Sequence, residues 1–232
     1  MLGCRRPRIS VTNMPKLSTL VVLAGLTVSA CSVVNPQIGQ LKTFKQEAAA
    51  RNWRAIANAK VECVPRSQGC VQLHQIKADA CMSLADQLAP TQQSANYDCA
   101  ITEYQAAIAA QHRQADATVD MARLQTSQLD ALSRRRDISR SEEEAARFNR
   151  ELLRDATILV KAAPARTAGN YYVGDALLSQ ALSEQPPASC ETLHRAVIAL
   201  GDASRWPNVY AGAIAQRQRD IENATRAGRC NM

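Results

Sequence analysis

The segment Ser141–Pro164, SEEEAARFNRELLRDATILVKAAP, is the clearest sign that this chain is helical. Ser141, followed three residues later by Glu144, forms a capping box, which is typical of a helix N-terminus. The proline ends the pattern, because it lacks the backbone N–H that a helix interior needs. Between these limits, apolar residues at steps of three or four predict an amphipathic helix with one buried stripe: Ala145, Phe148, Leu152, Ala156, Leu159 and Ala163.

The composition extends this prediction to most of the 232 residues. The chain has 40 alanines, the strongest helix former, but only 9 glycines, 9 prolines and 4% aromatic residues. Strand and turn formers are therefore too few for an all-β fold, and 21% charged residues with little glycine exclude disordered and collagen-like classes. We expect an all-α fold of antiparallel helical hairpins. The predicted helices cover about 37–60, 71–88, 95–111, Ala115 to the arginines at 134–136, 142–163, 168–184, 190–204 and 207–227.

The first 30 residues have the order of an export signal. Positive residues up to Lys16 precede the apolar segment Leu17–Val28, which is too short to span a bilayer, and the same order holds if translation starts at Met14. This segment carries four of the 28 basic residues and no acidic one, which leaves 24 basic and 21 acidic residues in the remainder. The net charge of +7 therefore gives little support to nucleic-acid binding, and we expect none.

The junction Val28-Ser29-Ala30-Cys31 resembles the lipobox of bacterial lipoproteins. In that family the cysteine is acylated and becomes the first residue of the mature protein. The resemblance implies a signal peptide over 1–30, a lipidated Cys31 with a short tether over 31–36, and a helical domain over 37–232. The next residue is serine where the family's inner-membrane signal has aspartate, which implies the periplasmic face of the outer membrane. An ordinary secretory signal with an unmodified thiol is the alternative.

Six cysteines remain once Cys4 and Cys31 are set aside, and an even number in an oxidising compartment predicts three disulfides. Many pairings are open, but the spacing favours local ones: Cys63 with Cys70, Cys81 with Cys99, and Cys190 with Cys230. A metal site is the alternative, with a ligand set of Cys63, Cys70, His74 and Cys81. Because this set lacks the tight C-x2-4-C spacing of structural zinc sites, we expect neither a metal nor another cofactor.

Two helix pairs are similar to each other in sequence. Residues 78–83 match 174–179, and residues 102–109 match 192–199, which indicates one helical hairpin that occurs twice. One helix resembles the small-aromatic-small pattern of a tetratricopeptide (TPR) repeat at Ala100, Tyr104 and Ala107. The resemblance implies a short TPR-like array with a concave face for a partner, and a compact bundle of alanine-rich helices is the alternative.

The sequence holds no catalytic motif that we recognise, so we expect no enzyme activity and name no catalytic residue. The histidines show no convincing ligand or triad spacing: His74, His112 and His194. Glu142–Glu144 is typical of a helix N-terminus, where the helix dipole favours acidic residues. Arg134–Arg136 is typical of a solvated helix end, with contact to an anionic partner as the alternative. We expect Trp206 and Tyr210 to pack in the core.

These features favour a membrane-anchored lipoprotein that acts as a non-catalytic interaction module or scaffold in the cell envelope. Its expected partners are the membrane and another envelope protein, and its oligomeric state is left open. The alternatives are an envelope enzyme, such as a cell-wall hydrolase, and a purely structural envelope protein. A concave pocket with two carboxylates, or a histidine beside a nucleophile, would favour the enzyme, and a long apolar groove would favour binding.

Overall fold

The computed structural model describes residues 36–63, 67, 69–162, 167–206, 208–228 and 230. All regular structure in these residues is helical, which confirms the all-α prediction. The signal segment, Cys31 and the tether up to residue 35 lie outside the described residues. None of the described helices is both long enough and apolar enough to cross a membrane.

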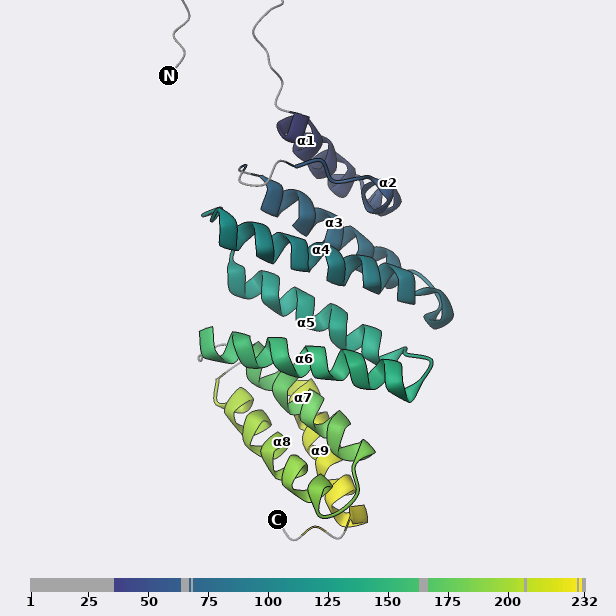
Figure 1. Ribbon diagram of the computed structural model, residues 1–232, viewed down its shortest axis with the longest axis vertical. Coiled ribbons are helices and arrows are strands. Elements are labelled where there is room, and N and C mark those ends of the chain that lie inside the picture. Colours follow the sequence, from purple (N-terminus) through teal and green to yellow (C-terminus); the bar gives the residue numbers. More distant parts are fainter. Residues whose placement is uncertain are drawn as a thin grey trace, which may run out of the picture. The chain divides into compact units, whose positions relative to one another are not determined.

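Nine α-helices and one short 3-10 helix follow one another in the described part of the chain (Figure 1). Their bounds are α1 Pro36–Ala49, α2 Trp53–Asn58, α3 Cys70–Ala85, η1 Pro90–Gln92, α4 Ser94–Arg113, α5 Met121–Asp137, α6 Glu142–Ala162, α7 Thr167–Ser183, α8 Ala188–Ser204 and α9 Ala211–Gly228. Most of them match the predicted helices to within a few residues.

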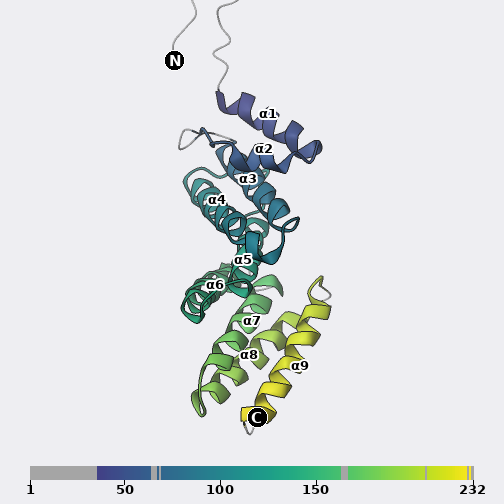
Figure 2. The ribbon, with the colours of Figure 1, turned by 90° about the vertical axis from the view of Figure 1, so that its right-hand side faces the viewer.

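Consecutive helices pack side by side as antiparallel hairpins (Figures 1 and 2). The two most extensive contacts join α3 to α4 and α7 to α8, the same helix pairs whose sequences match. Smaller contacts link α5 to α7 and α7 to α9. From α3 onward, each helix therefore contacts mainly its neighbours in the chain, as in a helical array, whereas α1 packs more on α3 than on α2.

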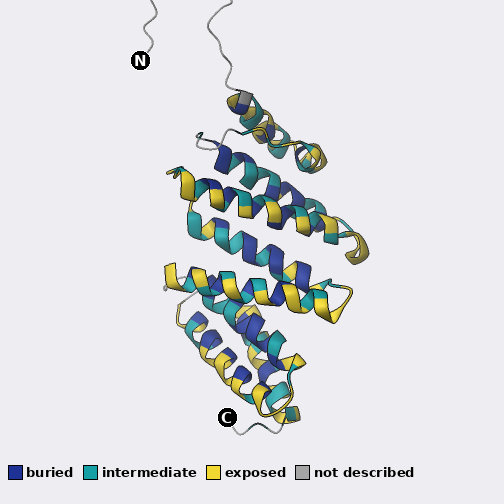
Figure 3. Cartoon of the chain, in the orientation of Figure 1, coloured by how far each residue is buried: buried dark blue, intermediate teal, exposed yellow. Residues whose placement is uncertain are grey.

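Small residues let these helices approach closely. Ala78, Ala100 and Ala107 are fully buried between α3 and α4, and Figure 3 shows buried faces along the helices of the array. A Cβ atom added at Gly174 of α7 would lie 2.6 Å from Cγ of Leu200 in α8. Because that distance is far below van der Waals contact, only glycine allows α7 and α8 to pack at this separation.

The single helix expected over 37–60 is wrong, because the chain breaks it into α1 and α2. Arg51, between them, has a left-handed φ of 56°. The turn allows Phe44 and Ile56 to join one buried cluster with Leu73 of α3. In a continuous helix those two side chains would lie about 18 Å apart along the axis and could not share that cluster.

Two other helices start later than the sequence predicts. The stripe from Ala115 predicts an early start, but α5 begins at Met121. Asp120 caps it, since its carboxylate accepts a 2.9 Å hydrogen bond from the backbone N–H of Ala122. Helix α9 begins at Ala211, four residues later than expected.

Three disulfides join the described cysteines in the pairs that the spacing favours, with Cα–Cα distances of 5.4, 6.0 and 5.4 Å: Cys63–Cys70, Cys81–Cys99 and Cys190–Cys230. The first lies at the start of α3, the second joins α3 to α4, and the third joins α8 to the residues after α9. Each therefore ties together segments that are neighbours in the chain. The second also removes Cys81 from the alternative metal-ligand set.

Candidate functional site

A pocket of about 480 Å³ opens on the face formed by α3, α5 and α7. These are the first helices of three successive hairpins, so the pocket lies on one face of the array. Residues from α4 and from the segment before α9 complete its wall. We call it the acidic pocket, after its charged and aromatic lining residues Asp79, Asp86, Asp130, Arg134, Tyr104, Tyr172 and Tyr210.

The side chain of Asp79 is exposed to solvent, and one hydrogen bond fixes the orientation of its carboxylate. Oη of Tyr104 donates a 2.5 Å hydrogen bond to its Oδ1. Partial desolvation raises the pKa of Asp79, and the Tyr104 hydrogen bond and the charge of Arg123 offset this only in part. Desolvation and the Asp79 carboxylate in turn raise the pKa of Tyr104, so its hydroxyl stays protonated and remains the donor.

Arg134 connects the other two carboxylates of the pocket. Its Nη1 lies 2.7 Å from Oδ1 of Asp86, and its Nε lies 3.0 Å from Oδ2 of Asp130. Oη of Tyr172 also donates to Oδ1 of Asp130, at 3.3 Å. The lining residues thus hold three carboxylates and one guanidinium, and Arg134 pairs with two of the carboxylates. Asp79 is the third, and among the described residues the only cation that acts on it is Arg123, which does not line the pocket.

This chemistry suits a cationic group. A lysine or arginine side chain can pair with the carboxylates, and tyrosine rings attract cations through their π faces. Two carboxylates in a concave pocket are also what the enzyme alternative requires, with Asp79 as its candidate proton donor because of the raised pKa. The acidic pocket is therefore the place where both alternatives can be tested.

None of these aspartates was predicted from the sequence to be a site residue. Asp79 on α3 and Asp86, which caps the C-terminus of that helix, are seven residues apart. This spacing places both on one face of a helix and could have been read from the sequence. Asp130 joins them only through helix packing, which the sequence does not reveal. Tyr104 was assigned a packing position by the TPR resemblance, and it is indeed buried, with its hydroxyl turned to Asp79.

The aromatic residues near α9 differ from expectation in part. Trp206 is 59% exposed, so the prediction that it packs in the core is wrong. It follows the end of α8 at Ser204, where the chain turns at the surface. Tyr210 does pack, since its ring stacks on Tyr171 with centroids 4.8 Å apart and meets the edge of Tyr172.

The arginines at 134–136 are a solvated helix end only in part. Arg135 and Arg136 are each 6% exposed, because acidic side chains from other segments pair with them. Nη2 of Arg136 lies 2.8 Å from Oδ2 of Asp175, and Nε of Arg217 lies 2.6 Å from Oδ1 of the same residue. One buried carboxylate thus connects α5, α7 and α9, and we call these three residues the Asp175 network.

A second chemical cluster surrounds the first disulfide. Nε2 of His74 lies 3.5 Å from Sγ of Cys63, and Nδ1 lies 2.6 Å from Oε2 of Glu103. The other oxygen of Glu103 lies 2.8 Å from Nζ of Lys77. Burial acts to raise the pKa of Glu103, but the bonds from His74 and Lys77 outweigh it, so the pKa is lowered and Glu103 is ionised at neutral pH. The sulfurs of Cys63 and Cys70 are joined to each other instead of to a metal.

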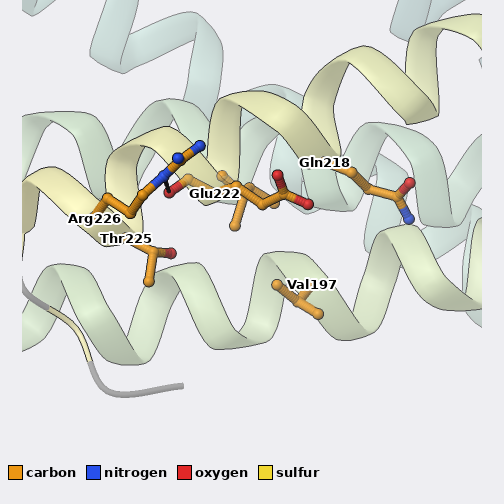
Figure 4. A pocket seen from close by; sticks show the side chains of 6 residues that line it. Val197, Gln218, Glu222, Thr225 and Arg226 are labelled. Atoms are coloured by element: carbon orange, nitrogen blue, oxygen red, sulfur yellow. Dashed lines mark hydrogen bonds between the residues drawn. The ribbon is translucent and has the colours of Figure 1, made fainter.

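A groove of about 680 Å³ lies between α8 and α9 (Figure 4). Val197 of α8 lines one side, and Glu222 and Arg226 of α9 line the other. The groove therefore mixes apolar and charged side chains, unlike the long apolar groove expected of a binding module. The remaining histidines lie apart from the disulfide cluster, His194 exposed on α8 and His112 in a pocket lined by α4, α5 and α6.

No protein-family model, curated protein or solved structure matches the chain at a significant level. Its function must therefore be inferred from its own pockets, charges and disulfides. The acidic pocket and the cluster around the first disulfide bring together the side chains best placed to bind or to react.

Proposed function

We propose that the chain is an interaction module of the bacterial cell envelope that binds a cationic segment of a partner protein in the acidic pocket. An acylated Cys31 holds it at the outer membrane, and the helical array faces the periplasm. In this role the chain acts as a scaffold, and the acidic pocket binds its partner without catalysing a reaction.

The acidic pocket is the observation that carries this proposal. It lies on a face built from three hairpins, which gives an extended partner more surface than a single hairpin offers. Two of its three carboxylates pair with Arg134, and the third, Asp79, can be approached from solvent. A lysine or arginine side chain that enters would gain a charge-assisted hydrogen bond without displacing the Arg134 ion pairs.

The disulfides support the proposed location. Structural disulfides persist in oxidising compartments such as the periplasm and are rare in the cytosol. The chain has three of them in its described residues, which fits export by the leader. Two or three acyl chains on Cys31 would make attachment effectively permanent, since each buried methylene contributes about 0.8 kcal/mol.

Removal of the negative charges of Asp79 and Asp130 is expected to reduce capture of the partner about tenfold, because the ion pair between the pocket and the partner's cationic side chain is lost. A photo-crosslinking amino acid at Met82, which lines the pocket, would capture the partner in intact cells, and the adduct would be quantified with and without Asp79→Asn and Asp130→Asn. Asp155→Asn, in the pocket lined by α4, α5 and α6, is the matched control and should leave capture unchanged. Capture that does not differ between the pocket variants and the control would contradict the proposal.

Lipidation at Cys31 has a separate test. Cells grown with an alkyne fatty acid are expected to label the full-length protein, and Cys31→Ala should abolish the label because no thiol remains at the junction. Cys4→Ala, which lies in the leader, is the control and should label normally. A Cys31→Ala protein that labels as strongly as the parent would contradict the anchor but leave the pocket proposal standing.

An envelope hydrolase is the second candidate function, and the raised pKa of Asp79 favours it. In that case Asp79 would act as a general acid on an envelope polymer. Incubation of the purified chain with peptidoglycan should then release soluble fragments, and Asp79→Asn should abolish their release. A binding module releases none.

A further inference from the structure

The Cys63–Cys70 disulfide differs from the other two in the side chains around it. Nε2 of His74 is 3.5 Å from Sγ of Cys63, and the ligand atoms of His74 and both cysteines lie within 4.8 Å of one another. Cys63 is half-exposed. Cys99, Cys190 and Cys230 of the other two disulfides are partly exposed as well, so exposure does not distinguish this pair. The histidine does, since within the described residues no histidine bonds to a sulfur of either other pair.

His74 is held in one orientation with respect to the sulfur. An ionised carboxylate can only accept hydrogen bonds, so Glu103 requires the proton on Nδ1 of His74 and turns Nε2 towards Cys63. A protonated Nε2 would donate to a thiolate at Cys63. Lys77 holds the other oxygen of Glu103, which fixes the carboxylate in turn.

Cys70 is favoured as a thiolate for a different reason. It is the first residue of α3, a helix of 16 residues, and the positive end of a helix dipole stabilises a thiolate there. Both products of reduction are therefore stabilised, one by the His74–Glu103 pair and the other by the helix. A disulfide whose thiolates are stabilised is easier to reduce and is the better oxidant.

We propose that Cys63–Cys70 is a site of thiol–disulfide exchange at which the chain oxidises thiol compounds. A substrate thiolate attacks Sγ of Cys63, the more exposed sulfur, forms a mixed disulfide and releases Cys70 as a thiolate. A second substrate thiolate attacks the substrate sulfur of the mixed disulfide and releases Cys63 beside His74. Two thiolates thus become one disulfide, and the two electrons end on Cys63 and Cys70, which leave as thiolates. The protons of the two substrate thiols pass to solvent when those thiols ionise. This activity is independent of the acidic pocket.

The test measures reduction of each disulfide separately in the oxidised, folded mature chain. Glutathione is added at neutral pH, samples are blocked with an alkylating reagent over time, and mass spectrometry of peptides reports the free thiols of each pair. We expect Cys63–Cys70 to be reduced at least about tenfold faster than Cys81–Cys99 and Cys190–Cys230. His74→Ala should slow this pair about tenfold, whereas His112→Ala, which alters a histidine of another pocket, should not.

Two outcomes would overturn the proposal. One is reduction of Cys63–Cys70 at the rate of the other two pairs. The other is fast reduction of this pair at equal rates in His74→Ala and His112→Ala, because the exposure of Cys63 alone would then explain the rate. Glu103→Gln keeps the size of the side chain and should slow the reaction in the same direction as His74→Ala. Circular dichroism tests whether each variant is folded. If His74→Ala does not fold, Glu103→Gln is compared with His112→Ala in its place.

Discussion

Replacement of Asp175 by asparagine is expected to lower the free energy of unfolding by about 3–5 kcal/mol. Asp175 is 2% exposed and pairs with Arg136, which is 6% exposed, and with Arg217. Asparagine keeps the volume but removes the negative charge, which leaves the buried Arg136 guanidinium paired with the exposed carboxylate of Asp137 and without its buried one. Because these partners lie on α5, α7 and α9, the variant also loosens the contact among three helices.

Asp137→Asn is the matched control for this prediction. Asp137 also pairs with Nη2 of Arg136, at 2.7 Å, but it is 53% exposed, and an exposed pair contributes less than about 1 kcal/mol. Urea denaturation of both variants under non-reducing conditions measures the difference. Equal losses of unfolding free energy would mean that burial of the Asp175 ion pairs adds nothing to stability, which would contradict this prediction.

Removal of the last disulfide is expected to have the second large effect. Replacement of Cys190 and Cys230 by alanine should cost about 4 kcal/mol, because the crosslink spans 40 residues and restricts the unfolded chain strongly. The pair Cys63 and Cys70 spans only 7 residues, so the same replacement there should cost about 2 kcal/mol.

We expect the loss of stability to be larger for the disulfide that closes the longer loop. Denaturant midpoints of the two double variants, measured without reductant, should place the variant lacking Cys190–Cys230 below the variant lacking Cys63–Cys70. The reverse order would show that native contacts of α9, and not the length of the closed loop, determine what the last disulfide contributes.

Features governed by local rules were predicted from the sequence. Helix α6 begins at Glu142, and Oγ of Ser141 accepts a 3.2 Å hydrogen bond from the backbone N–H of Glu144, which is one of the two bonds of a capping box. The Glu144 carboxylate accepts from the backbone N–H of Arg140 instead of Ser141. The disulfide pairs were also predicted, since each joins segments or helices that follow one another in the chain, although the last pair closes a loop of 40 residues. Neighbouring residues contain enough information for features of this kind.

Features that depend on distant contacts were missed. The break at Arg51 has no glycine or proline to mark it, and it forms because Phe44 and Ile56 both pack against α3. Arg136 appeared solvated because its partner Asp175 lies 39 residues away. The acidic pocket combines residues of several helices in the same way, so no pattern in the sequence predicted that its three aspartates lie together.

The cysteines pair in the order in which they occur after residue 62, the first with the second, the third with the fourth and the fifth with the sixth. When such a polypeptide leaves a secretion channel with its N-terminus first, both cysteines of one pair emerge before the first cysteine of the next pair. An oxidase that joins thiols as they arrive produces the native connectivity directly. If the chain is exported as proposed, its yield should be normal in cells that lack a disulfide isomerase.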